Sequence, residues 1–172
     1  MTMKRKVASV RCSAKADKKR SGERVEAIFL ERAVSQGLAI AKPWGDSERY
    51  DFIIDAGGKL CRVQVKSSSY KPIGRYGYHF KAYTRSSKRG NAYTADQIDV
   101  LAAYIVPENV WFIIPLEALN HAMAFMVHTY PPRNPNNRSQ HRAHDFEPYR
   151  EAWWILGAEK SAGAKAGAAR NP

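Results

Sequence analysis

The chain has 172 residues, of which 44% are hydrophobic, so it can bury one full core, and its length suggests a single domain. No apolar run approaches the roughly 20 residues that span a bilayer, and no apolar signal-peptide core follows the basic start, which excludes a membrane-spanning chain. The formal net charge of +12 indicates a polyanionic partner.

The positive charge is concentrated at the two ends of the chain. Residues 1–20 are basic and poor in large apolar side chains, so we expect a disordered arm. Residues 157–172 are rich in Ala, Gly and Lys and predict a disordered tail. Such arms raise the affinity for nucleic acid without adding sequence specificity. The folded domain is therefore expected to comprise residues 21–156.

An amphipathic helix is predicted from Ser21, a suitable N-cap, to Gln36, because Gly37 follows as a stop signal. At the helical period, one arc of this helix combines apolar side chains with the acidic Glu26. An acid on a stripe that should face the core either reaches solvent from its edge or serves a function. The stripe consists of Glu26, Phe29, Leu30 and Ala33.

Two strands are predicted on either side of Gly57 and Gly58, after a short strand over residues 38–41 and a loop over residues 42–46. Gly-Gly between β-rich runs is typical of a two-residue hairpin turn, since both turn positions need positive φ. The resulting register pairs Asp55 with Leu60, Ile53 with Arg62 and Asp51 with Gln64.

Asp51 and Gln64 therefore face each other on one side of the hairpin, with Cβ atoms roughly 4.5–5.5 Å apart. The side-chain period of two places Lys66 on the same side as Gln64. A four-residue turn would shift the register by two residues, which keeps the same face and makes Asp51 diagonal to Gln64. In either case a carboxylate, an amide oxygen and an ammonium group converge on one face.

Residues 67–94 are rich in basic and aromatic side chains and contain no Asp or Glu. Basic side chains neutralise phosphates, and aromatic rings stack on bases or enter a groove, so this segment is a candidate DNA-contacting surface. For the aromatic rings we favour the alternative, burial on a half-covered sheet, and for the basic residues we favour DNA contact. The basic residues are Lys71, Arg75, Lys81, Arg85, Lys88 and Arg89, and the aromatic ones are Tyr70, Tyr76, Tyr78, Phe80, Tyr83 and Tyr93.

Nearly continuous apolar runs over residues 99–106 and 110–115 predict a second hairpin, whose strands are covered on both faces of the sheet. A helical turn over residues 116–120 and a strand over residues 122–128 are expected next. After an irregular, proline-containing loop, residues 145–156 predict a capped helix. Its apolar face would consist of Phe146, Tyr149, Trp153 and Leu156.

The polar groups on the first hairpin suit metal-assisted hydrolysis of a phosphodiester. A hard cation such as Mg²⁺, or Mn²⁺ in its place, prefers oxygen ligands and keeps several waters. Asp51, Gln64 and the Val65 carbonyl are candidate metal ligands. Glu26, on a helix that we expect to pack against the same face, would complete the shell through water or hold a second ion. Lys66 beside the ion is a candidate for orienting and deprotonating the attacking water, or for offsetting charge in the transition state.

The order of Glu26, Asp51 and Gln64-Val65-Lys66, on a helix, a strand and the next strand, resembles the PD-(D/E)XK nuclease superfamily. That superfamily includes type II restriction enzymes and archaeal Holliday-junction resolvases. The residues are similar to the branch with Gln in place of the second acid, which contains group I intron-encoded homing endonucleases. The resemblance covers residues 22–119 and neither tail. Gln64 removes one charge from the site, which should weaken metal affinity.

The resemblance implies an α/β fold, a restriction-endonuclease-like core with a mixed central β-sheet flanked by α-helices. It also implies a Mg²⁺-dependent endonuclease of double-stranded DNA, in which Glu26, Asp51, Gln64 and Lys66 are catalytic, and suggests a homing endonuclease of a mobile element. Cutting both strands generally needs two sites, so a homo-oligomer, either a dimer or a tetramer, is expected.

Two alternatives remain open at this point. A Holliday-junction resolvase or repair-type nuclease would read the shape of DNA, and a catalytically inactive module of the same fold would only bind it. The intact set of candidate catalytic residues favours an active enzyme over the inactive module. The two cysteines, Cys12 and Cys61, form neither a disulfide framework nor a zinc pattern, which favours an intracellular, cytoplasmic protein with no membrane partner.

Overall fold

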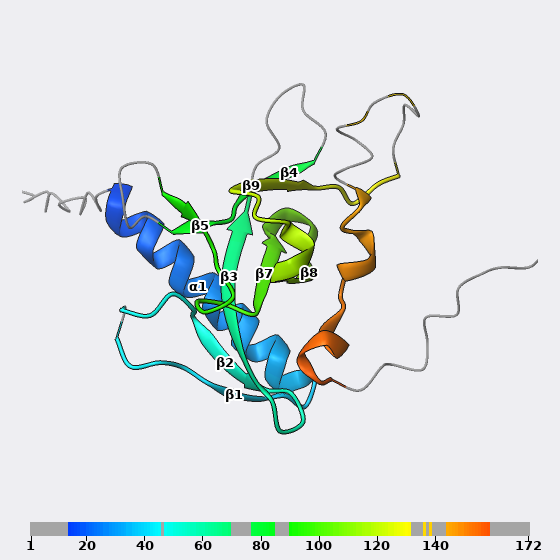
Figure 1. Cartoon of the computed structure of the whole chain (residues 1–172). Coiled ribbons are helices and arrows are strands. Elements are labelled where there is room, and N and C mark those ends of the chain that lie inside the picture. The colour runs from blue at the N-terminus through cyan, green and yellow to red at the C-terminus, as the bar shows by residue number, and fades with distance from the viewer. Residues whose placement is uncertain are drawn as a thin grey trace, which may run out of the picture.

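A five-stranded mixed sheet forms the centre of the computed structural model, which describes residues 14–45, 47–69, 77–84, 90–131, 136, 138 and 144–158 (Figure 1). In spatial order its strands are β1 (Ala39–Ala41), β2 (Phe52–Asp55), β3 (Leu60–Ser68), β7 (Val100–Ile105) and β8 (Val110–Pro115). β3 and β7 are parallel, and the other neighbouring pairs are antiparallel. The predicted mixed sheet of an α/β fold is confirmed.

The β2–β3 hairpin has the register that its turn residues predict. Asp55 pairs with Leu60 and Ile53 with Arg62. Gly57 and Gly58 have φ angles of 70° and 95°, the left-handed values that a two-residue turn needs and that glycine adopts without strain. The two glycines therefore determine the turn, and the turn fixes which residues of β2 and β3 are paired as far as Phe52 and Val63.

The central strands β7 and β8 are covered on both faces, as their continuous apolar runs predict. Alternate residues of β7 belong to two separate cores: Tyr104 lies on the side of the first, and Leu101 and Ile105 lie on the side of the second. In β8, Trp111 joins the first core and Phe112 the second. The short 3-10 helix η1 (Val106–Glu108) joins the two strands.

Helix α1 (Ala14–Ser35) begins seven residues before the predicted start at Ser21, so part of the expected disordered arm is helical. Ser21 lies inside the helix and does not cap it. The reason is that residues 14–20 are Ala, Lys, Arg and Asp, with no proline to stop the helix. The predicted end is confirmed: Gly37 has a φ of 76°, and its N–H donates to the Val34 carbonyl at 2.9 Å.

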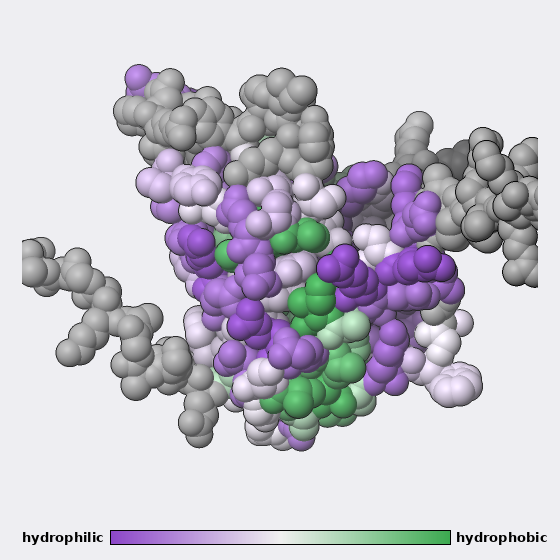
Figure 2. All heavy atoms as spheres, turned by 180° about the vertical axis from the view of Figure 1, so that it is seen from behind, coloured by the Kyte–Doolittle hydropathy of each residue, from purple (hydrophilic) through white to green (hydrophobic). Residues whose placement is uncertain are grey.

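Helix α1 covers the first core through Val25, Phe29 and Ala33, which are buried. The Phe29 ring lies 5.2 Å from the Phe52 ring and 5.3 Å from the Trp111 ring, between centroids. The predicted stripe is wrong at Leu30, which is 42% exposed, because the buried arc is rotated toward Val25. Figure 2 shows the molecule from behind, where hydrophilic side chains form most of the coloured surface and the largest group of apolar ones lies in its lower part.

The opposite face of the sheet is covered by short strands. β4 (Tyr78–Lys81) pairs with β9 (Ala124–Val127), and β5 (Tyr83–Thr84) pairs with β6 (Asn91–Ala92). The helical turn expected before β9 is the 3-10 helix η2 (Leu116–Leu119). Tyr78, Phe80 and Tyr93 are buried in the second core, which confirms burial for these aromatic rings.

The predicted helix over residues 145–156 is wrong. Two 3-10 helices, η3 (Glu147–Tyr149) and η4 (Trp153–Leu156), form there instead. Between them Arg150 forms a β-bridge with Phe112 of β8, and the Glu151 carboxylate accepts hydrogen bonds from the Trp111 N–H and the Trp153 indole, both at 2.8 Å. Pairing with the edge of the sheet thus outweighs the local helical pattern.

No helix among the described residues is long and apolar enough to cross a membrane.

A charged clamp ties β3 to β7 next to the site. The Asp99 carboxylate accepts hydrogen bonds from the Arg62 backbone N–H at 2.8 Å and from the Arg62 Nε at 3.0 Å, and the Asp99 N–H donates to the Arg62 carbonyl at 2.9 Å. The Arg62 guanidinium also donates to the Ala95 carbonyl. This clamp sets the register of the parallel pair, in which Gln64 lies opposite Leu101.

We expect Asp99→Asn to lower the free energy of unfolding by about 1–3 kcal/mol at pH 7, because it weakens charged hydrogen bonds. Arg62 holds the pKa of Asp99 below 3.8, so this stabilisation is present above pH 4 and is lost as the pH falls through the folded-state pKa. Urea titrations at pH 7 and below pH 4 would show a difference that shrinks in acid. Asp145→Asn, at an exposed position away from Arg62, serves as control, and an equal loss in both variants would contradict a specific clamp.

Candidate active site

Asp51 and Gln64 meet at the start of β2, as the hairpin register predicts. The Asp51 N–H donates to the Val63 carbonyl at 2.9 Å and continues the ladder of hydrogen bonds. Its carboxylate oxygen Oδ2 accepts the Val65 N–H at 2.7 Å and also accepts the Gln64 Nε2. The carboxylate is therefore held against β3 by one backbone and one side-chain donor.

The amide of Gln64 is buried and has a partner on each side. Its Nε2 points to the Asp51 carboxylate and lies 3.2 Å from the Val65 carbonyl oxygen. Its Oε1 accepts the hydroxyl of Tyr93 at 3.2 Å. The amide nitrogen thus places partial positive charge between two oxygens that are candidate metal ligands, while the amide oxygen faces Tyr93.

Lys66 lies on the same face of β3, two residues beyond Gln64. Its Nζ is 5.8 Å from the centroid of the Tyr93 ring, a distance typical of a cation–π contact. Burial lowers the pKa of Lys66, and the negative charges of Asp51 and Glu26 oppose that shift. The predicted convergence of Asp51, Gln64 and Lys66 is therefore present in the structure.

Glu26 reaches the site from the other side of the sheet. We predicted that its helix packs against the face of Gln64 and Lys66, and this is wrong, because α1 packs on the opposite core, which contains Val63 and Val65. Glu26 instead shares with Asp51 the lining of a hollow of ≈ 350 Å³, the mixed hollow. Its side chain is 24% exposed, and Oε2 accepts the Nζ of Lys42 at 2.7 Å.

The electrostatic environment of Asp51 disfavours its charged form. Burial is the main cause that raises the pKa of Asp51 to about 6, and the charge of Glu26 adds to the rise. The hydrogen bond from the Val65 N–H and the charges of Lys66 and Lys42 act in the opposite direction. A cation at this position would therefore stabilise the charged form of Asp51, which the protein's own groups stabilise only in part.

The donor set fits a hard divalent cation. Two carboxylates, a backbone carbonyl and a side-chain amide offer oxygen atoms, which Mg²⁺ prefers. The ligands that fit are Asp51, Val65, Gln64 and Glu26, and the amide would turn its oxygen inward to bind an ion. Within the described residues no group of three or more His, Cys, Asp and Glu side chains is placed to hold a metal ion, so water would supply a large share of the ligands.

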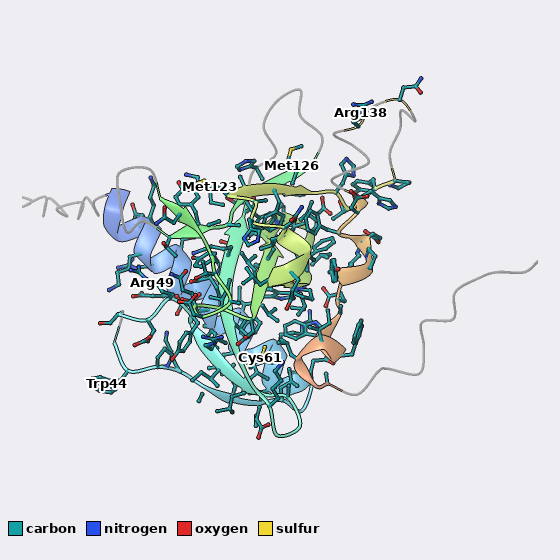
Figure 3. All side chains as sticks on the ribbon, viewed as in Figure 1. Trp44, Arg49, Cys61, Met123, Met126 and Arg138 are labelled. Atoms are coloured by element: carbon teal, nitrogen blue, oxygen red, sulfur yellow. The ribbon has the colours of Figure 1, made fainter. Side chains whose placement is uncertain are left out.

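Three site residues escaped the sequence analysis. Tyr93 is buried, as expected for the aromatic rings of this segment, but its contacts with Gln64 and Lys66 have no counterpart among the sequence-based predictions. Lys42 was placed in a loop, although it pairs with Glu26. Arg49 was not singled out, and it lies on the loop before β2, where Figure 3 labels it. The only sequence signal for the last two is the proximity of two basic residues to Asp51.

Most of the predicted DNA-contacting residues cannot be placed. Lys81, on β4, is exposed and lies near the site, in a hollow that it shares with Lys66. The other five fall outside the described residues. They are Lys71, Arg75, Arg85, Lys88 and Arg89.

A family model described as PD-(D/E)XK endonuclease matches residues 16–149, which is most of the chain. The chain belongs to the PD-(D/E)XK endonuclease family. Nucleases of this family generally use divalent metal ions, and they act on DNA. The match includes Glu26, Asp51, Gln64 and Lys66.

Solved structures agree with this PD-(D/E)XK assignment. The chain is similar to the bacterial homing endonuclease I-Ssp6803I, with 26% identity and a TM-score of 0.65, over 81% of this chain and 92% of that one. This similarity supports the expected homing-endonuclease branch. Comparison with curated proteins found no match.

Two further structures are more distant. Hjc, a Holliday junction resolvase from Archaeoglobus fulgidus, has 14% identity and a TM-score of 0.49, over 82% of this chain and 99% of that one. MepB has 16% identity and a TM-score of 0.47, over 72% of this chain and 93% of that one.

The neutral amide of Gln64 in this PD-(D/E)XK site can be replaced by a carboxylate of nearly the same size. We expect Gln64→Glu to lower the free energy of unfolding by about 1–3 kcal/mol in EDTA at pH 8, because the new carboxylate loses the donors to Asp51 and Val65 and adds a like charge. With Mg²⁺ the same carboxylate is a stronger ligand, so the rise in Tm on adding Mg²⁺ should be larger than in the wild type. Thermal unfolding with EDTA and with Mg²⁺ measures both effects.

Gln36→Glu adds the same charge at the exposed end of α1 and serves as the control. The interpretation of Gln64 as a metal ligand loses its support if the Mg²⁺-dependent rise in Tm is unchanged in Gln64→Glu.

Proposed function

We propose that the protein is a Mg²⁺-dependent endonuclease that hydrolyses phosphodiester bonds in double-stranded DNA, with Mn²⁺ as an effective substitute. The observation that carries this proposal is the convergence at the β2–β3 hairpin of the Asp51 carboxylate, the Gln64 amide and the Lys66 ammonium. Family membership supports a nuclease, and the oxygen donors support the metal.

The residues of the chain would divide the work as follows. Asp51, Gln64, the Val65 carbonyl and Glu26 would hold the ion, which supplies Lewis-acid polarisation of a phosphoryl oxygen and a more acidic water. Lys66 would stabilise the negative charge that develops on the attacked phosphate and orient the attacking water. Its lowered pKa makes the ammonium a better proton donor than an exposed lysine.

The biological form of the enzyme belongs to the same proposal. Similarity to a bacterial homing endonuclease supports a DNA endonuclease that serves a mobile element. Cutting both strands needs two sites, so we propose a homo-oligomer, either a dimer or a tetramer, that works inside the cell. The nuclease domain would comprise residues 21–156 together with the helical extension of α1, and the basic ends would add nonspecific affinity for DNA.

Supercoiled plasmid and synthetic four-way junctions, each incubated with Mg²⁺, Mn²⁺ or EDTA, test the proposal. Metal-dependent linear plasmid is the expected product. Faster cutting of junctions than of duplex would favour a resolvase, and DNA binding without any cut would favour an inactive module. The variant Lys66→Ala must remove the cleavage, since a contaminating nuclease would remain in that preparation.

A further inference from the structure

A second hollow of ≈ 390 Å³ adjoins the active site on the side of Lys66. It is open to solvent and is lined by the loop before β2, by β3, β4 and β5, and by the residue after β6. We call it the cationic hollow. It is lined by Arg49, Lys66, Lys81, Tyr83, Thr84 and Tyr93.

The charge of the cationic hollow has one sign. Arg49, Lys66 and Lys81 contribute three cations, and no acidic residue is among the described residues that line it. The mixed hollow on the other side of Asp51 contrasts with it, because Glu26 and three further acids face its lysines. Lys66 lies where the cationic hollow meets the catalytic residues. A polyanionic strand that places one phosphate at Lys66 is therefore attracted into the cationic hollow and not into the mixed one.

The aromatic walls of the cationic hollow are packed against neighbouring groups. Tyr93 is buried and held by its hydrogen bond to Gln64. The half-buried Tyr83 ring rests on Gly90, where an added Cβ would lie 2.7 Å from the Tyr83 Cδ2 and 3.1 Å from the Thr84 carbonyl oxygen. Gly90 also has a φ of 70°, so glycine alone fits there without strain. A half-buried ring that packs on the backbone in this way offers a flat surface on which a planar ligand can stack.

We infer that the cationic hollow binds one nucleotide of the substrate strand, the one next to the reacting phosphate, with its phosphate between Arg49 and Lys81 and its sugar or base against Tyr83. This inference rests on the proposed function. The volume is in the range of small-molecule sites and exceeds what a phosphate alone would fill. Arg49 and Tyr83 thereby become positioning residues that hold the strand so that the next phosphate lies at Lys66.

The test uses the full chain in EDTA, so that neither metal nor cleavage contributes. Thymidine 3′,5′-bisphosphate, inorganic phosphate and thymidine are titrated by calorimetry and by ³¹P NMR. The bisphosphate is expected to bind about tenfold more tightly than inorganic phosphate, because it uses both the cations and the ring. Thymidine, which has no charge, is expected to bind too weakly to measure. Equal affinity for bisphosphate and inorganic phosphate would overturn the nucleotide site.

Variants separate the parts of the site. Arg49→Gln and Lys81→Gln should each weaken bisphosphate binding about 5- to 10-fold, whereas Lys59→Gln, which removes the same charge at the hairpin turn, should leave it within twofold. Tyr83→Leu should reduce the advantage of the bisphosphate over phosphate and leave phosphate binding unchanged. Equal losses in all three charge variants would mean general electrostatics and would overturn the inference.

The two proposals fail in different ways. If the bisphosphate binds as expected but no plasmid is cut with Mg²⁺, the nucleotide site holds and the endonuclease proposal fails. If plasmid is cut while Arg49→Gln and Lys81→Gln bind the bisphosphate like the wild type, the endonuclease proposal holds and the nucleotide site fails.

Discussion

Lys66→Ala is expected to cut DNA about 10²- to 10³-fold more slowly than the wild type at saturating enzyme, while it binds DNA nearly as tightly. The side chain lies on the catalytic face of β3, and its charge interacts with Asp51 and Glu26. The contact of its Nζ with the Tyr93 ring holds the ammonium in place before substrate binds. A preorganised charge of this kind acts mainly on the transition state, so its loss appears in the rate.

Single-turnover cleavage and equilibrium binding in EDTA, measured on the same DNA, separate the two effects. An ordinary phosphate contact would instead weaken binding and lower the salt slope by about one, with little change in rate once the DNA is bound. Lys59→Ala, an exposed lysine at the hairpin turn, is the matched control and should resemble the wild type in both measurements. If Lys66→Ala cuts at the wild-type rate under saturation, the Gln64-Val65-Lys66 segment is an ordinary strand.

Asp51→Asn is expected to abolish both cleavage and the rise in Tm on adding Mg²⁺, yet to make the metal-free protein more stable at pH 8. Burial raises the pKa of Asp51 from 3.8 to about 6, so its charged form destabilises the fold. The native state then binds more protons than the unfolded state between these two pH values, and stability falls as the pH rises through them. The rise in the pKa of Asp51 corresponds to a loss of at most roughly 3 kcal/mol in the free energy of unfolding above pH 6. The neutral Asn would recover this loss.

Urea unfolding in EDTA at pH 8 and pH 4 measures this effect. The gain in stability should be present at pH 8 and small at pH 4, where Asp51 is already neutral in the folded state. Asp145→Asn, at an exposed position outside the hairpin, is the control for loss of a carboxylate. A variant Asp51→Asn that is less stable than the wild type at pH 8 would show that the Val65 and Gln64 donors outweigh burial.

The neutral Gln64 amide also affects the charged form of Asp51. In the metal-free protein the Gln64 amide donates to the Asp51 carboxylate, and an acid in its place could not do so unless protonated. With Gln64 the metal-free site is therefore more stable than it would be with a second carboxylate, but its affinity for a metal ion is lower. Tyr93 suits both orientations of the amide, because its hydroxyl can donate to the amide oxygen or accept from the amide nitrogen. Burial raises the pKa of Tyr93 to about 12, which keeps that hydroxyl protonated.

Local chemistry determined the catalytic hairpin. Gly57 and Gly58 define the turn, and the side-chain period of two then places Asp51 opposite Gln64 with Lys66 on the same face. These residues lie within about 20 positions of one another, so backbone geometry alone decides how they are arranged. The apolar runs of β7 and β8 were equally informative, because strands covered on both faces need apolar residues at every position.

The tertiary structure decided the features that depend on contacts between distant segments. The C-terminal segment has a helical pattern, yet Arg150 pairs with Phe112 at the sheet edge, and no local rule contains that partner. The face of the sheet that α1 covers depends on how Phe29 packs against Trp111.

The contacts around the catalytic hairpin also depend on residues that are distant in the sequence. Tyr93 and Gln64 are 29 residues apart in the sequence, and their contact exists because the segment between β6 and β7 returns beside β3. Glu26 and Lys42 meet because α1 and the β1–β2 loop flank the same hollow. The chain thus specifies its catalytic groups locally through the turn and the strand period. Their pKa values, their partners and the cationic hollow arise only when packing removes them from water and brings distant charges together.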